Sequence, residues 1–312
     1  MLISMGESLI DLVQVGRDDQ GSPLFCAREG GSPFNVAMAM AHLGARAGFI
    51  CPTSQDAFGA QLRSRLSEAG VTNLCGGGID RPTALAVVST DESGHPSYAF
   101  HREKTADRNP NADELLSVLP ESVEALHFGS MVLAQGEDWP AWREVVIRAR
   151  ERGMTIALDP NIRLNLVDDF NALRARLHEA LELADLVKTS DEDLRLLHPQ
   201  AAPESVLTEW RERYGLRLAI LTQGSQGAIA WNDAGSVDCP GFELPGPVVD
   251  TVGAGDTFQG AFLAWLARHG QLRAVLSREA LADMLEFATK AAGINCMRAG
   301  CQPPTLHDIT DP

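Results

Sequence analysis

The stretch Asp250-Thr251-Val252-Gly253-Ala254-Gly255-Asp256-Thr257-Phe258 decides how this chain is interpreted. Its small residues at 253–255 let the backbone approach a ligand closely, and residues 257–268 continue in a helical pattern. The amides of Gly253, Ala254 and Gly255 would therefore lie at a helix N-terminus, which favours a bound anion. Asp256 beside that anion makes sense if it takes a proton from an attacking hydroxyl while the amides stabilise a transferring phosphoryl group. The alternative is that Asp256 only caps the helix.

A second glycine-rich segment lies near the N-terminus and also opens a helical pattern. It reads Glu29-Gly30-Gly31-Ser32-Pro33-Phe34-Asn35-Val36-Ala37. Ser32 is expected to be the N-cap, with Pro33 at the first helical position. The Asn35 amide can donate to and accept from sugar hydroxyls. Taken by itself, however, the segment is better explained as a tight turn with a capping Asn.

Short apolar runs alternate with helical patterns along the chain, which predicts α/β architecture with a mostly parallel sheet between helices. The expected strands are 1–5, 48–51, 125–128, 155–158, 185–188 and 218–222, and the expected helices are 33–43, 57–69, 139–152, 172–183, 257–268 and 280–295. Two stretches interrupt this alternation: 9–27, extended around a turn at 18–21, and 83–102, a hairpin around a turn at 91–94. We expect a single domain over 1–312, with a small antiparallel β lid formed by about 9–27 and 83–102.

Composition and motif absences narrow the class of protein. The net charge of −16 argues against binding to nucleic acid or to an anionic membrane surface. The sequence has no G-x-x-x-x-G-K-[ST] motif and no strand followed by G-x-G-x-x-G, so neither a P-loop nor a Rossmann site is expected. None of the six cysteines forms a C-x-x-C pair, and the N-terminus has no signal-peptide pattern. We therefore expect a cytoplasmic protein.

In this order along the chain, the two glycine-rich segments resemble the signatures of the ribokinase-like (PfkB) family of sugar kinases. Further matching elements cover nearly the whole chain: Gly6-Glu7, Asp11, Asp56-x-Phe58-Gly59, Gly70-Val71, Asp159-Pro160-Asn161-Ile162-Arg163, Thr222-Gln223-Gly224-Ser225-Gln226-Gly227-Ala228 and Gly300. Within the family, residues 6–11, 97–108 and 159–163 are most similar to bacterial fructokinases. His101 is a departure, because a Tyr is more usual there.

The resemblance implies transfer of the γ-phosphoryl group of ATP to a primary hydroxyl, which in fructose is the 6-hydroxyl. Asp256 would be the general base, and the backbone at 253–256 would form the anion hole. The residues implied to bind the sugar are Asp11, Gly30, Gly31, Asn35, Arg102 and Arg163, and those implied near the nucleotide are Thr222, Gly224, Gly227, Lys188 and Ser190. For the two arginines, surface ion pairing is the alternative.

The resemblance also implies metal ions. Mg²⁺ accompanies ATP, and the family's Asn-x-x-Glu motif appears here as Ser190-Asp191-Glu192-Asp193. Either Asp193 or Glu192 could therefore organise Mg²⁺ through water. K⁺ is a further candidate, and the backbone carbonyls that would bind it belong to Asp250, Val252, Asn295, Arg298 and Gly300.

Two rival functions remain at this stage. A 2-keto-3-deoxygluconate kinase of the same family would use Arg102 or Arg163 to hold the substrate carboxylate. A non-catalytic sugar-binding or sensing protein would keep the fold, but the retention of Asp256 and its glycines argues against it. The expected ligands are a small sugar and ATP, and an exposed face of the lid could pair two copies into a homodimer.

Overall fold

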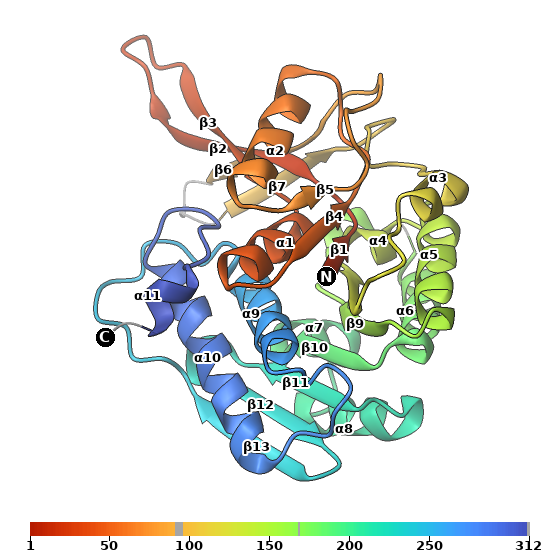
Figure 1. The fold of residues 1–312 in the computed structure, drawn as a ribbon. Helices are drawn as coiled ribbons and strands as arrows, with labels where there is room; N and C mark the ends of the chain where they lie inside the picture. Colours follow the sequence, from red (N-terminus) through yellow and green to blue (C-terminus); the bar gives the residue numbers. More distant parts are fainter. Residues whose placement is uncertain (91–95, 168, 311–312) are drawn as a thin grey trace.

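The computed structural model of the 312-residue chain describes residues 1–90, 96–167 and 169–310. A nine-stranded sheet forms its centre, with strand order β13-β12-β11-β10-β9-β8-β1-β4-β5 (Figure 1). The strands are β1 (Leu2–Met5), β4 (Ala47–Ile50), β5 (Thr72–Asn73), β8 (Ala125–Gly129), β9 (Thr155–Asp159), β10 (Leu186–Ser190), β11 (Leu218–Thr222), β12 (Gly227–Asn232) and β13 (Gly235–Pro240). Neighbours pair in parallel except β11–β12 and β12–β13. The predicted mostly parallel sheet is confirmed.

Helices cover both faces of this sheet, and each face has its own apolar cluster. One face carries α1 (Ser32–His42), α2 (Ala57–Glu68), α9 (Ala254–Arg268), α10 (Arg278–Cys296) and α11 (Leu306–Thr310). The other carries α3 (Ala112–Ser117), α4 (Met131–Ala134), α5 (Trp139–Glu151), α6 (Phe170–Leu183), α7 (Asp191–Leu197) and α8 (Pro203–Tyr214). Side chains alternate between the clusters along a strand, so Leu2 packs in the first and Ile3 in the second.

A small second sheet has the order β3-β2-β6-β7, formed by β2 (Leu9–Arg17), β3 (Pro23–Gly30), β6 (Ala84–Thr90) and β7 (Pro96–His101). Each of its two hairpins is antiparallel, as predicted, and β2 pairs with β6 in parallel to join them. The predicted turn at 91–94 lies outside the described residues. The tip of the β2–β3 hairpin projects from the body (Figure 1). Because β3 ends at Gly30, this sheet leads directly into α1.

Candidate active site

Asp256 lies in the first turn of α9, and its side chain does not cap the helix. The N-cap is Gly253, in the left-handed region at φ 76°, where a Cβ would collide with Sγ of Cys301. The Ala254 amide donates to the carbonyl of Thr251 at 3.2 Å. Among the described residues, no group accepts from the amides of Gly255 and Asp256. The turn therefore offers free N–H groups at a helix N-terminus, as an anion site requires.

Three side-chain donors surround the Asp256 carboxylate, which is only 7% exposed. Ser32 Oγ donates to Oδ1 at 2.6 Å, and Asn35 Nδ2 donates to Oδ2 at 2.8 Å. Asn161 Nδ2 approaches Oδ1 at 3.4 Å and also donates to Ser32 Oγ at 2.7 Å. The two glycine-rich segments and the loop after β9 therefore meet at one carboxylate.

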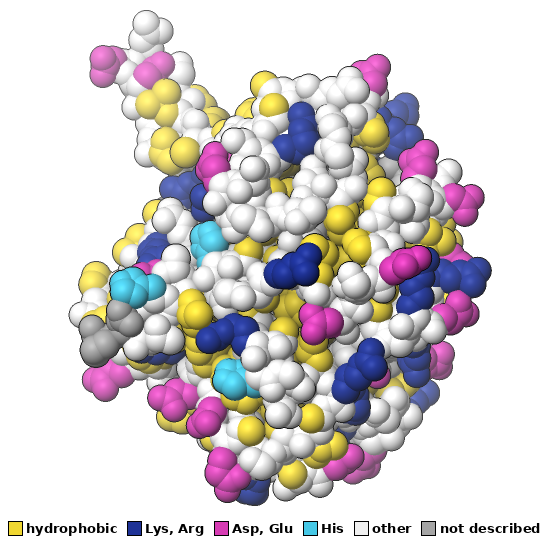
Figure 2. All heavy atoms as spheres, in the orientation of Figure 1, with side chains coloured by type: hydrophobic (Ala, Val, Ile, Leu, Met, Phe, Trp, Pro, Cys, Tyr) yellow, Lys and Arg dark blue, Asp and Glu magenta, His cyan; other side chains and the backbone are white. Residues whose placement is uncertain are grey.

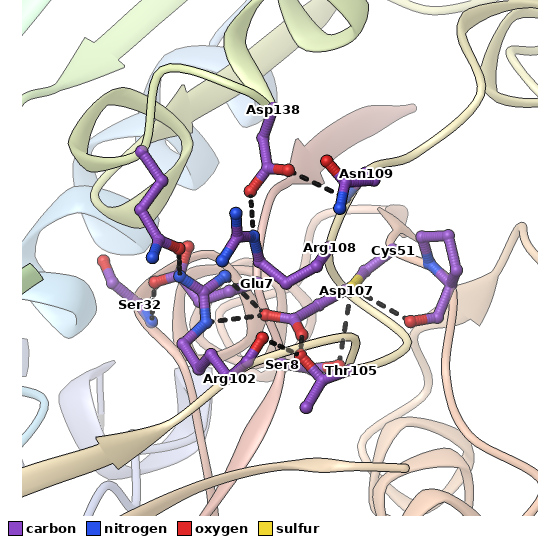
Figure 3. Close-up of polar contacts among 12 residues, drawn as sticks. Glu7, Ser8, Ser32, Cys51, Arg102, Thr105, Asp107, Arg108, Asn109 and Asp138 are labelled. Carbon is purple, nitrogen blue, oxygen red and sulfur yellow. Dashed lines mark hydrogen bonds and ion pairs between the residues drawn. The ribbon is translucent and has the colours of Figure 1, made fainter. Parts of the chain in front are cut away.

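The structure corrects the role expected of Ser32. Helix α1 begins at Ser32 itself, its N-cap is Gly31 at φ 108°, and the Ser32 hydroxyl points to Asp256 instead of capping. The Ser32 amide donates to Glu7 Oε1 at 3.2 Å, and a Cβ on Gly31 would lie 2.7 Å from the Glu7 carbonyl oxygen (Figure 3). The positive φ and this close approach both require a glycine at position 31. The contacts hold the start of α1 against the segment that follows β1.

Asp11 on β2 reaches the same region. Its pKa is raised to about 6, because burial and, to a smaller extent, the nearby Asp256 charge outweigh the lowering by Arg163 and Arg28. Gly30 makes room for this carboxylate, since a Cβ at 30 would collide with Asp11 Oδ2. The small sheet thus brings an acidic hydrogen-bond acceptor toward Asp256.

A buried ion pair lies beneath the turn that precedes Asp256. Lys188 Nζ is 2.6 Å from Asp159 Oδ2, and these side chains are 5% and 1% exposed. Lys188 Nζ also lies 3.5 Å from the carbonyl oxygen of Gly255. The pKa of Asp159 is raised to about 6, because burial raises it by more than Lys188 lowers it. Lys188 therefore lies next to the turn that precedes Asp256, with its charge already paired with Asp159.

The candidate magnesium ligands differ in position. Asp193 is 7% exposed, and its Oδ1 accepts the Ile162 amide at 2.9 Å, whereas Glu192 faces outward. Ser190 Oγ accepts the Asp193 amide at 3.0 Å and caps α7. Within the described part of the chain, no three metal-binding side chains cluster together. A single inward carboxylate suits Mg²⁺ that is carried mainly by phosphates and water.

Four of the predicted nucleotide residues lie at or just after the carboxyl ends of β10 and β11. Ser190 and Thr222 are register partners at the ends of β10 and β11. Gly224 and Gly227 follow, at φ 57° and 105°. A Cβ on Gly227 would collide with the carbonyl oxygen of Cys239, so close packing against β13 also explains that glycine.

The segments that hold the candidate K⁺ carbonyls are joined by hydrogen bonds. Asn295 is fully buried and its Nδ2 donates to the Val252 carbonyl at 2.8 Å. The Gly300 amide donates to Asp250 Oδ2 at 2.8 Å, and the Arg298 amide donates to the Asn295 carbonyl at 3.0 Å. The five candidate residues therefore lie in one connected region, which joins the loop before α9 to the C-terminal end of α10 and the residues that follow it.

The two predicted substrate arginines have different surroundings. Arg102 is 5% exposed, and Asp107 and Gln135 occupy its guanidinium at distances of 2.5–3.0 Å (Figure 3). It anchors the end of β7 to the body. Arg163 is partly exposed, and within the described residues no carboxylate lies within 4.0 Å of it. Of the two, only Arg163 has a guanidinium that is available to a ligand.

Asn161 and Ser32 are site residues that sequence reasoning assigned no catalytic part. Asn161 belongs to the quoted 159–163 motif, and its φ of 40° is left-handed, a conformation that Asn adopts more readily than most residues. Ser32 belongs to the first glycine-rich segment. No local pattern indicated that either side chain would reach a residue 95 or 224 positions away.

Comparisons with known proteins find fructokinases among the proteins that are similar to this chain. The chain is 32% identical over 322 residues to "Probable fructokinase-4" of Arabidopsis thaliana, covering 99% of this chain and 95% of that protein. It matches a fructokinase from Xylella fastidiosa with bound ATP at a TM-score of 0.88 and 26% identity, over 99% of this chain and 96% of that one. It also matches a double mutant of a fructokinase from Vibrio cholerae O395 in fructose, ADP and potassium ion bound form, at a TM-score of 0.80 and 26% identity, over 96% of this chain and 93% of that one.

None of the helices in the described residues is both long and apolar enough to span a bilayer. Residues 1–308 match the model of the pfkB family of carbohydrate kinases, which is nearly the entire chain. With the glycine-rich turn before α9, its aspartate and the small sheet beside them, this match places the chain in that family. The protein is a member of the pfkB family of carbohydrate kinases.

Proposed function

We propose that the protein is an ATP-dependent fructokinase that converts ATP and D-fructose to ADP and fructose 6-phosphate. The observation that carries the proposal is the buried Asp256 carboxylate, held by Ser32 and Asn35 beside the free amides of the α9 N-terminus. A base and an anion site in contact are what phosphoryl transfer to a hydroxyl needs. The fructokinases among the similar proteins support fructose as the acceptor.

Asp256 would take the proton of the 6-hydroxyl as that oxygen bonds to the γ-phosphorus and the bond to the ADP oxygen breaks. The amides of Gly253, Gly255 and Asp256 would stabilise the charge on the transferring group. Mg²⁺ would neutralise phosphate charge, with Asp193 holding its water ligands.

The sugar would be oriented by Asp11, by the backbone at Gly30 and Gly31, and by Asn35. The Asn35 Oδ1 is buried and has no hydrogen-bond partner among the described residues. It can therefore accept a hydrogen bond from a sugar hydroxyl while Nδ2 stays on Asp256. Lys188, which lies at the anion site, would stabilise the phosphates without leaving Asp159.

We also propose K⁺ as an activating ion in the region formed by residues 250–252 and 295–300. A potassium ion is part of the Vibrio cholerae fructokinase complex. Carbonyl oxygens have two lone pairs, so those of Val252 and Asn295 can still bind a cation while each accepts one hydrogen bond. A cytoplasmic location would suit the use of ATP and the six free cysteines.

A homodimer through the small sheet is a further part of the proposal. The projecting β2–β3 hairpin carries the exposed apolar side chains Val15, Leu24 and Phe25, at 58%, 47% and 42% exposure. Figure 2 shows hydrophobic side chains along this hairpin, which stands clear of the body. Exposed apolar surface on a sheet edge is typical of a pairing site. Phe25→Asp should convert a dimer to a monomer in light scattering, and an unchanged mass would contradict this assembly.

The decisive experiment is an ADP-release assay with a panel of fructose, ribose, glucose and 2-keto-3-deoxygluconate. We expect the highest kcat/KM with fructose. The available guanidinium of Arg163 favours ketodeoxygluconate kinase as the second candidate, because it could hold the acid's carboxylate. A higher kcat/KM with that acid would refute fructose as the substrate. ADP release with none of the sugars would indicate the non-catalytic binding protein.

A further inference from the structure

We propose that Ser32 and Asn161 form a two-step hydrogen-bond relay that positions the Asp256 carboxylate for proton removal. This inference rests on the proposed role of Asp256 as the base. Neither residue needs to touch the substrate, so both are positioning residues.

The direction of the relay follows from donor chemistry. The Asn161 amide nitrogen can only donate, so at 2.7 Å it gives a hydrogen bond to Ser32 Oγ. Ser32 has a single hydroxyl proton, and it donates this proton in a hydrogen bond of 2.6 Å to Asp256 Oδ1. A hydroxyl that accepts one bond is polarised to donate the next, and a bond to a carboxylate is stronger than one between neutral groups.

Both members of the relay are held by the backbone. Ser32 is 6% exposed, and its amide donates to the side chain of Glu7, which follows β1 (Figure 3). Asn161 keeps a left-handed φ of 40°, which for a residue other than glycine has an energetic cost and persists only where the surroundings fix it. This strain places its amide between Ser32 and Asp256.

Fixing Oδ1 in this way determines where Oδ2 lies. Oδ2 accepts from Asn35 and retains a lone pair, which leaves it able to receive the proton of the sugar hydroxyl. Without the relay the carboxylate can turn about its last torsion, and misplacement by about 1 Å can cost ~10²-fold in rate. Asn35 still restrains the group, so we expect a loss of about 10-fold for either relay residue.

The test compares Ser32→Ala and Asn161→Gly with wild type. Glycine adopts a positive φ without strain, so Asn161→Gly removes the amide and keeps the backbone. The matched control is Asn109→Gly, because Asn109 has a φ of 48° and its backbone amide, which glycine retains, makes the bond to Asp138. We expect kcat to fall about 10-fold in both relay variants, with KM for fructose and ATP within two-fold of wild type and the control unchanged.

A double-mutant cycle distinguishes positioning from structural damage. In an Asp256→Asn background, Ser32→Ala should change the residual rate less than two-fold, because the relay acts only through the carboxylate. If the wild-type protein phosphorylates fructose and both relay variants have the same kcat as wild type, the relay is overturned but the proposed function is not. Loss of folding in a thermal melt, or an equal loss of rate in the Asp256→Asn background, would also overturn it. ADP release by wild type with none of the sugars would instead refute the proposed function.

Discussion

Asp256→Asn distinguishes a general-base role of Asp256 from a purely structural one, and the structure shows which hydrogen bonds the substitution leaves in place. The asparagine carbonyl can still accept from Ser32 and Asn161 at the Oδ1 position. Its NH₂ would face Asn35 Nδ2, which now lies 2.8 Å from Oδ2, so two donors would meet. Rotation of the Asn35 amide would bring its unpartnered Oδ1 to that NH₂ and restore the bond.

We therefore expect Asp256→Asn to change the activation free energy of the reaction more than the free energy of unfolding. Loss of a general base costs ~10²–10⁴-fold in kcat, or about 3–5 kcal/mol of activation free energy. Stability should fall by no more than about 1–3 kcal/mol, the cost of one unsatisfied buried group, and by less if the Asn35 amide rotates. Removing a negative charge beside bound phosphates should leave ATP affinity equal or higher.

The assay is ADP release with fructose, accompanied by calorimetric ATP binding and a thermal melt. Asp238→Asn is the matched control, because Asp238 is an exposed residue of β13. A kcat within a few-fold of wild type would remove Asp256 from the mechanism. A purely structural role for Asp256 would give the opposite pattern, with lower stability and nearly normal turnover.

Three further outcomes are expected. The pKa of Asp11 is raised to about 6, so its carboxylate gains a proton as pH falls through 6; KM for fructose should then rise in wild type, and a flat profile would exclude Asp11 from sugar binding. Lys188→Met should lower the urea-measured unfolding free energy by about 3–5 kcal/mol at pH 8, because Asp159 is left buried and unpaired. Burial raises the pKa of Asp159, so this loss should shrink toward pH 6 as the group becomes neutral; a pH-independent loss would contradict the ion pair. Fructose should slow hydrogen exchange in 96–108 if the small sheet closes as a lid, and unchanged exchange at saturation would exclude closure.

The regular elements were predictable because their signals are local. All six strands and six helices expected from apolar patterns are present, with ends shifted by three residues or fewer. The pairing of β2 with β6 was not predictable, because a pattern of alternation identifies each hairpin but not which strands then pair in parallel.

The site was predictable in part. The turn before α9 and Asp256 were identified from small residues at a helix start. Ser32 was expected to be a cap because Ser before a helix usually is one, but the long-range bond to Asp256 decided its position. The pairing of Asp159 with Lys188 depends on β9 and β10 being neighbours, which neither strand indicates by itself.

The sequence distances within the relay have a consequence for folding. The hydrogen bonds to Asp256 join residues that are 224 and 221 positions apart, and Asn161 reaches Ser32 across 129. Contacts between residues so far apart in the sequence form slowly, because the entropy cost of closing a long loop comes before the contact can stabilise the fold. During refolding, the helical circular-dichroism signal should therefore recover before enzymatic turnover. The return of activity would then report the late docking of Ser32, Asn35 and Asn161 against Asp256.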